Sequence, residues 1–264
     1  MHPPHLIDEN WISTFHSNSW GELFDSDISE QGDIFFTLDI QDTLFYGDTL
    51  YIPPEPFASR NNLLVKMDKN GQPQWLKYLD SQNHSHLPLK VNNITDETIV
   101  VHQDEEGFVR ITAVHENGTT AWQESIVGLD GSSLPTNDLY IHENGEIFIA
   151  GHFSGVISYQ EAEIQTQTYS LFILRIQPDG AVTAFQPVAD CAMIDHRVTV
   201  DQDLNVYVSS DINGPLVVNG DTLNTESSWN WERGNLLKFD SSLVFQWYYN
   251  MELQGTEVTF IEIE

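Results

Sequence analysis

The sequence predicts an all-β fold of the β-propeller class, with four four-stranded units followed by the first strand of a fifth. Three observations predict it: a recurring motif of strand, polar turn and aromatic residue, an apolar strand at a regular offset after each aromatic, and a polar hairpin inserted in three of the units. Repeats of this size, made of short strands, bury their faces against their neighbours along the chain.

In the recurring motif, an apolar strand leads through a polar turn to an aromatic side chain. The copies end at Trp75, Trp122, Phe185 and Trp247, and Trp11 forms a leading copy. They recur at roughly 60 residues, with a shorter second interval, a period typical of repeat architectures. We expect these aromatic residues to be equivalent anchors in the core between adjacent units.

One position in the strand of this motif is basic in three copies, at Lys66, Arg175 and Lys238, whereas the second copy has Ala113. Long basic side chains can pair with acidic neighbours while their stems cover apolar surface. We therefore expect a structural role for the three cations. The alternative is a ring of cations around a central channel, which would attract an anion.

A second apolar strand follows each aromatic after a turn, and a shorter strand precedes it, which indicates a hairpin. The four copies of the second strand are residues 32–36, 97–101, 145–151 and 205–208. With the strand before the motif's turn and the strand that ends on its aromatic, each unit has four strands, as a propeller blade does. The predicted units are approximately 12–75, 76–122, 123–185 and 186–247, with a partial unit at 248–264.

Three units carry an additional polar hairpin, at residues 44–50, 155–159 and 214–223, and the second unit lacks it. With residues 145–155 and 64–75, these segments resemble the repeat of the Bacteroidetes-type family of secreted β-propeller proteins. In that family, a glycine-flanked strand precedes a strand with a basic residue, a turn and a tryptophan. The resemblance implies a propeller in an extracellular or cell-surface location, and it implies no single biochemical activity.

The last residues, 257–264, align with the first strand of a further unit. Closed propellers usually have more than four blades, and an incomplete blade leaves an unpaired strand edge. We therefore expect the chain to be a fragment or a truncated propeller. In the alternative, the two termini combine into a closing unit.

Composition and charge narrow the classes of partner. The chain is 40% hydrophobic and 11% aromatic, enough for a sizeable core, and no run approaches the ~20 apolar residues of a membrane helix. Residues 1–5 do not have the pattern of a signal peptide. The formal net charge of -30 argues against nucleic acid and against direct membrane insertion, because an acidic surface repels phosphates and anionic lipids. It is compatible with cationic partners, with calcium, or with solubility alone.

Metal and nucleophile signals are incomplete. Cys191 is the single cysteine, so no internal disulfide forms, and its apolar neighbours indicate a small buried side chain. His84 and His86 could share one side of a strand, but two ligands do not make a zinc site. Asp201, Asp203 and Asn205 resemble the opening of a calcium loop whose remaining ligands are missing, so we predict a plain turn and no metal or cofactor, with calcium as the alternative.

The polar hairpin of the fourth unit contains the segment that we predict as the ligand-binding site. Trp229 and Trp231 would share one strand face and offer a stacking surface for a sugar ring or a protein. Asn230, Glu232 and Arg233 could direct hydrogen bonds around it. The competing interpretation is packing of both indoles against a neighbouring unit.

The predicted function is a non-catalytic extracellular or cell-surface module that binds a protein or glycan partner or acts as a scaffold. No catalytic residues are predicted. The alternative is a glycan-active hydrolase or lyase that uses paired carboxylates at a channel rim. An enzyme should gather acids with displaced pKa values in one cleft, whereas a module should have its acids spread over its rims.

Overall fold

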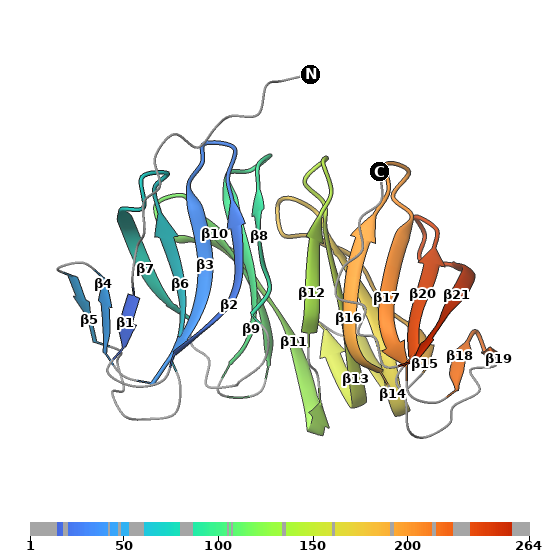
Figure 1. Cartoon of the computed structure of the whole chain (residues 1–264). Coiled ribbons are helices and arrows are strands. Elements are labelled where there is room, and N and C mark those ends of the chain that lie inside the picture. Colours follow the sequence, from blue (N-terminus) through green and yellow to red (C-terminus); the bar gives the residue numbers. More distant parts are fainter. Residues whose placement is uncertain are drawn as a thin grey trace.

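The computed structural model of the chain consists of antiparallel β-strands, which confirms the all-β prediction (Figure 1). It describes residues 15–17, 21–41, 43–46, 49–52, 61–79, 87–104, 106, 108–133, 136–159, 162–190, 193–212, 215–223 and 233–254. Nothing in these ranges is helical, and so no helix with the length and apolarity to cross a membrane occurs in them.

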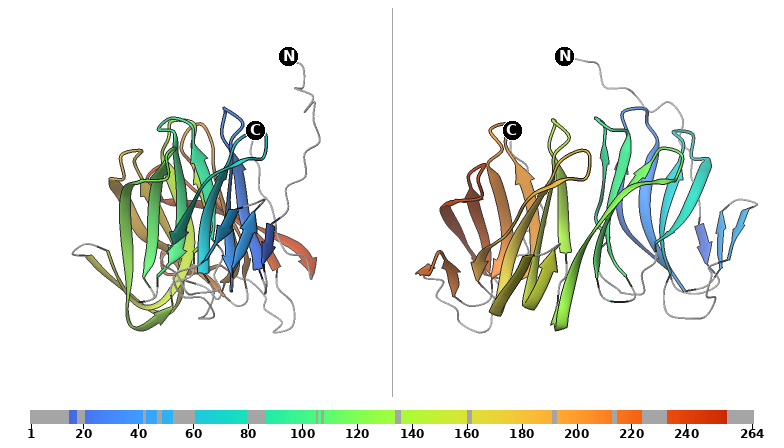
Figure 2. Two further views of the ribbon diagram at one scale, coloured as in Figure 1. Left: turned by 90° about the vertical axis from the view of Figure 1, so that its left-hand side faces the viewer. Right: turned by 180° about the vertical axis from the view of Figure 1, so that it is seen from behind.

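Sixteen of the strands form four successive groups of four, which stand side by side in sequence order (Figure 2). The first group is β2 (Gly21–Ile28), β3 (Ile34–Ile40), β6 (Asn61–Met67) and β7 (Pro73–Leu79). The second is β8 (Leu89–Asn92), β9 (Glu97–Gln103), β10 (Val109–His115) and β11 (Thr120–Ser133). The third is β12 (Thr136–Ile141), β13 (Ile147–Tyr159), β14 (Ala162–Ile176) and β15 (Val182–Asp190). The fourth is β16 (Met193–Val200), β17 (Val206–Ile212), β20 (Arg233–Phe239) and β21 (Phe245–Gln254).

The first strands of successive groups contact one another, β2 with β8, β8 with β12, and β12 with β16. These strands therefore form the inner edge of the arrangement, and the fourth strands lie away from it (Figure 1). The apolar strands that the sequence predicts near the inner side are β3, β9, β13 and β17, second from that edge.

Short hairpins accompany two of the groups. β4 (Leu44–Tyr46) pairs with β5 (Thr49–Tyr51) and with β1 (Phe15–Ser17), and β18 (Leu216–Val218) pairs with β19 (Asp221–Leu223) and with β15. In the third group, residues 155–159 do not form a separate hairpin. They continue β13, which remains paired with β14 beyond a bulge at Phe153 and Gly155.

The second and third groups are joined into one sheet, which the sequence did not predict. Residues 127–129 of β11 pair with the far half of β13, whereas β12 pairs with its near half. β9 and β13 therefore lie in the same ten-stranded sheet, and β3 and β17 lie in separate four-stranded sheets. The prediction of four separate sheets is wrong at this position, because β11 runs far beyond the aromatic at which it was expected to end.

Apolar side chains fill the spaces between neighbouring groups. The core between groups one and two contains Phe35, Leu64 and Val100, all buried. The next contains Ile111, Ile149 and Phe172, and the last contains Phe148, Val208 and Phe239. The middle strands of the second and third groups are buried on both faces, because each of these groups packs between two others. In the first group β6 is also buried along its length, and its other face lies in a cluster that includes Leu44 of β4. This explains why their sequences are continuous apolar runs.

The fourth strands place three aromatic residues opposite the repeated basic position. Trp75 pairs with Lys66, Trp122 with Ala113, and Trp247 with Lys238. In the third group, Arg175 instead pairs with Ala184, and Phe185 pairs with Leu174.

The predicted equivalence of the four aromatics is therefore wrong for Phe185. A shift of one residue turns a side chain to the other face of a strand. Phe185 accordingly packs in the core between groups two and three, and Ala184 packs in the core between groups three and four.

The two equivalent tryptophans that have a following group lie against a turn of that group. Trp75 donates from Nε1 to the carbonyl oxygen of Glu116 at 2.7 Å, and its ring covers Gly118. Trp122 covers Gly180 in the same way. Both glycines have positive φ, +86° and +90°, a conformation that a residue without a Cβ adopts readily. Trp247 is 42% exposed, since no later group is among the described residues.

Candidate functional site

The segment predicted to bind a ligand falls mostly outside the described residues. Trp229, Asn230, Trp231 and Glu232 lie outside them, and Arg233 is the first residue of β20. The backbone of Arg233 pairs with Ile212 and Gln254 in the fourth group. Carbohydrate or protein binding at this segment thus stays a prediction. His84, His86 and Cys191 also lie outside the described part of the chain.

The suspected calcium loop has the structure of a turn. The Asp201 carboxylate accepts hydrogen bonds from the backbone N–H groups of Asp203 and Asn205, from the Asn205 amide and from the Tyr207 hydroxyl. Burial opposes ionisation, but these hydrogen bonds, led by those from Asn205, lower the pKa of Asp201 below its ordinary value. Across the ranges that the structure describes, no three His, Cys, Asp or Glu side chains are placed to hold a metal ion.

The repeated basic side chains make contacts of the kind expected for a structural role. Lys66 lies 5.5 Å from the centre of the Phe35 ring, pairs with Asp33 at 2.8 Å, and reaches Glu116 of the next group at 3.0 Å. Burial opposes the charge on Lys66, but hydrogen bonds to Asp33 and Glu116 outweigh it and raise the lysine pKa.

Arg175 repeats this arrangement one interface later. Its guanidinium lies 5.5 Å from the centre of the Phe148 ring, donates to Glu146, and donates to the carbonyl oxygen of Ser241 in the fourth group. Lys238 lies 4.9 Å from the Tyr207 ring, and its Nζ is 4.0 Å from Asp201. The cations therefore connect strands and neighbouring groups.

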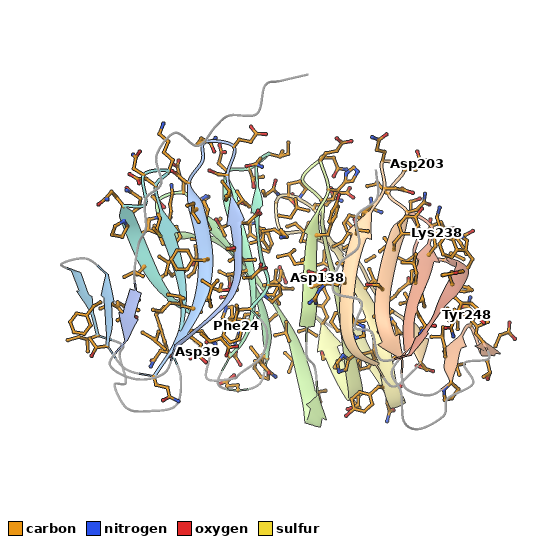
Figure 3. All side chains as sticks on the ribbon, viewed as in Figure 1. Phe24, Asp39, Asp138, Asp203, Lys238 and Tyr248 are labelled. Carbon is orange, nitrogen blue, oxygen red and sulfur yellow. The ribbon has the colours of Figure 1, made fainter. Side chains whose placement is uncertain are left out.

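Carboxylates at the inner edge connect the first strands. Asp25 and Asp27 of β2 accept hydrogen bonds from the backbone N–H groups of Leu89 and Val91 in β8. Asp138 of β12 likewise accepts from Val198 of β16 at 2.8 Å, about halfway along the strands (Figure 3). Burial raises the pKa of Asp138. These acids satisfy edge N–H groups that water would otherwise have to satisfy.

A chain of polar side chains is buried between the third and fourth groups. His152 Nδ1 lies 2.9 Å from His196 Nε2, and His196 Nδ1 lies 2.9 Å from the Ser210 hydroxyl. Burial, together with the nearby His152 ring, lowers the pKa of His196 to about 3. The order of serine and imidazoles is that of a nucleophile and its base, but Ser210 is 1% exposed and cannot meet a substrate.

Two open grooves lie beside the turns that join the first and second strands of the groups. One, of about 520 Å³, is lined by Lys66, Trp75, Asp96, His115 and Glu116.

The other, of about 360 Å³, lies between the β12–β13 and β16–β17 turns, at the edge of the molecule where Figure 3 places Asp203. We call it the acidic turn groove. Its walls include Tyr140, His142, Glu143, Asp201, Gln202 and Asp203.

His142 in this groove was missed by the sequence analysis. It stands at the first position of its turn, where the other groups have Ser29, Asn92 and Asp201, and each of these side chains accepts a hydrogen bond from a backbone N–H of the same turn. Alignment of the four turns would have singled out His142, because it is the only one of the four with an aromatic, titratable ring in place of a small polar side chain.

Comparisons with known proteins give no family. No family model matches the chain, and no curated protein matches it. Among solved structures, it is similar to a protein of unknown function from Dyadobacter fermentans, with 12% identity over 90% of this chain and 71% of the other, at a TM-score of 0.39. A catalytically inactive virginiamycin B lyase from Staphylococcus aureus, solved with quinupristin, has 9% identity over 88% and 96%, at 0.30. Both TM-scores are low, so nothing about the function of this chain follows from either protein.

Proposed function

We propose that the chain is a β-propeller module of the cell surface or the extracellular space, which binds a protein or glycan partner without catalysing a reaction. Four successive four-stranded groups, with their first strands along a common inner edge, support the propeller arrangement. On such a scaffold, recognition belongs to turns and loops, because their sequence can vary without disturbing the core.

The observation that carries the proposal is that the charged side chains make structural contacts between groups and between inner strands. Lys66 and Arg175 connect neighbouring groups, and Asp25, Asp27 and Asp138 connect inner strands. Of the described acids with displaced pKa values, Asp138 lies between inner strands, and Asp68 and Asp201 lie in separate turns. This arrangement favours a module over an enzyme, since paired catalytic carboxylates would share one cleft. The proposal includes no cofactor.

The test measures binding and turnover on the same samples. The full chain is incubated with immobilised and free oligosaccharides, and both bound ligand and released products are followed. We expect binding without products over many hours. Release of shortened or unsaturated sugars that depends on the protein would contradict the proposal and support the hydrolase or lyase alternative. Protease treatment of intact source cells should remove the protein, and protection from protease would contradict the surface location.

A further inference from the structure

We propose that Asn219, in the turn of the β18–β19 hairpin, is a site of spontaneous deamidation, and that the folded structure protects the other Asn-Gly pairs that it describes. The inference concerns a covalent modification and does not depend on the proposed binding function. In an Asn-Gly pair, the glycine nitrogen can attack the side-chain amide carbon of asparagine, because no Cβ crowds that nitrogen. Four such pairs lie in the described ranges, beginning at Asn70, Asn117, Asn144 and Asn219.

The first support is the state of the attacking nitrogen. In the other three pairs, the glycine N–H donates to the carbonyl oxygen of the residue three positions earlier, at 2.9 Å for Gly71, 2.9 Å for Gly118 and 2.8 Å for Gly145. Such a bond must break before the nitrogen can lose its proton and attack. The N–H of Gly220 donates to no acceptor among the described residues, so its nitrogen is available to react.

The second support is the freedom of the asparagine side chain. Asn219 is exposed, and its amide makes no hydrogen bond within the described part of the chain. In contrast, Oδ1 of Asn117 and Oδ1 of Asn144 each accept from a backbone N–H two residues on, at 3.0 Å and 2.9 Å. These bonds hold the two amides in place, whereas the amide of Asn219 can turn toward the next nitrogen.

The third support is the space around the turn. The hairpin lies at the periphery of the molecule (Figure 1), and no atom lies within 4 Å of a Cβ built on Gly220. At Gly118 the same position meets the Trp75 ring at 3.1 Å, and at Gly145 it meets Pro178 at 3.0 Å. The backbone at Gly220 can therefore rotate, and a cyclic intermediate has room to form there.

The geometry of the hairpin explains why a reactive pair stands at this position. Asn219 and Gly220 have φ of +53° and +84°, and they join two antiparallel strands in which Val218 is opposite Asp221. Asn-Gly is the preferred pair for a two-residue hairpin turn with positive φ at both residues. The fold thus selects this pair for its backbone conformation, and the reactivity accompanies it.

The reaction requires only water. The Gly220 nitrogen loses its proton and forms a bond to Cγ of Asn219, while the bond from Cγ to the side-chain nitrogen breaks and that nitrogen takes up a proton and leaves as ammonia. The product is a five-membered succinimide ring. Water then adds to one of the two ring carbonyl groups and opens the ring to aspartate or isoaspartate. Either product adds a negative charge, and isoaspartate also lengthens the main chain of the turn.

The experiment incubates the full chain at neutral pH, folded and unfolded in guanidinium chloride, and follows each Asn-Gly pair by peptide mass spectrometry. In the unfolded chain the four pairs should convert at similar rates. In the folded chain Asn219 should convert at nearly its unfolded rate, and Asn70, Asn117 and Asn144 should convert at least about tenfold more slowly. Fragmentation of the peptides distinguishes Asn219 from Asn213, which lies outside the described residues. Labelling by an isoaspartyl methyltransferase identifies the isoaspartate product.

The matched variant is Gly220→Ala. Its Cβ meets no neighbouring atom, so the chain should still fold, but the methyl group crowds the attacking nitrogen and should slow the conversion of Asn219 several-fold. Equal conversion in the folded variant and the parent chain would overturn the inference. So would a folded parent chain in which Asn219 converts no faster than the other three pairs.

Discussion

Single side chains at repeated positions connect the groups of this fold. Arg175 joins β14 to Glu146 beside it and to Ser241 of the next group, and Lys66 does the same with Asp33 and Glu116. Lys238 has the same position in the fourth group, but the described residues provide no later group for it to reach. A basic residue at this position is therefore expected to stabilise the protein more in the first and third groups than in the fourth.

Arg175→Met should destabilise the protein by about 3 kcal/mol, because Glu146, 8% exposed, would lose its cationic partner. The measurement is the free energy of unfolding in urea. Lys238→Met is the matched control and should have a clearly smaller effect, since its acid lies 4.0 Å away. Equal losses for the two variants would contradict the role given to Arg175 between the groups.

Buried histidines predict a pH dependence of stability. The pKa of His196 is lowered to about 3, mainly by burial, whereas its unfolded value is near 6.5. Below pH 6.5 the unfolded chain binds the proton and the folded protein does not, so stability is lost as the pH falls toward 3. At pH 5 this His196 effect amounts to about 2 kcal/mol. His196→Gln should reduce the difference in unfolding free energy between pH 7 and 5, and an unchanged difference would contradict this role of His196.

The spacing in the sequence predicted the positions of the repeated cations and of most of the aromatic residues. It did not predict for every side chain which face of the strand it occupies. The distance from Arg175 to Phe185 is one residue longer than that from Lys66 to Trp75, and the extra residue placed Phe185 on the opposite face. Because side chains alternate between the two faces of a strand, a shift of one residue moves a side chain to the other face. His142 was missed for another reason: its free nitrogen is evident only when its Nδ1 bond is known.

At the scale of elements, a tryptophan of one group and a glycine turn of the next form a repeated contact. A Cβ on Gly180 would lie 2.7 Å from Trp122 Cδ2, closer than packed carbon atoms approach. Gly220, in the short β18–β19 hairpin, has a similar φ of +84° with no atom within 4 Å of its virtual Cβ. Comparing alanine substitutions at the two glycines therefore distinguishes the cost of backbone strain from the cost of disturbing the tryptophan contact.

Gly180→Ala should therefore cost more than Gly220→Ala. The second substitution carries only the strain of a positive φ, about 1 kcal/mol. The first adds a clash that must displace Trp122, for a total of about 3 kcal/mol. Urea unfolding followed by tryptophan fluorescence provides both values. A Gly180→Ala variant as stable as Gly220→Ala would show that Trp122 is not fixed against this turn.

The order of elements was predictable from sequence, and their lengths were not. Strands β3, β9, β13 and β17 occur where apolar runs follow turns, since each such run packs against a neighbouring group. β11 and β13 continue past their repeats and pair with each other, because the segments after Trp122 and Gly151 carry apolar side chains that the core buries, such as Ile126 and Ile157, and find strand partners. Such pairing depends on partners distant in sequence, which a local pattern does not contain.

For the molecule as a whole, the dominant property is its charge. The chain has 40 acidic and 10 basic residues, and several of the cations are committed to contacts between groups. The remaining acids repel one another across the surface, which weakens the compact state. Attractive pairs such as Lys66 with Asp33 act at short range and are largely buried, so salt screens them less than it screens the surface repulsion.

Added salt should accordingly stabilise the protein. We expect the urea midpoint of unfolding to rise as NaCl increases from 20 to 300 mM, because the screening length falls from about 20 Å to about 6 Å over that range. Sucrose at matched osmolarity separates screening from a general solute effect. Calcium chloride at equal ionic strength tests the calcium alternative, since a specific site would raise the midpoint further in proportion to the logarithm of the ion concentration. A midpoint that falls with NaCl would mean that attraction between the paired charges exceeds the repulsion among the acids.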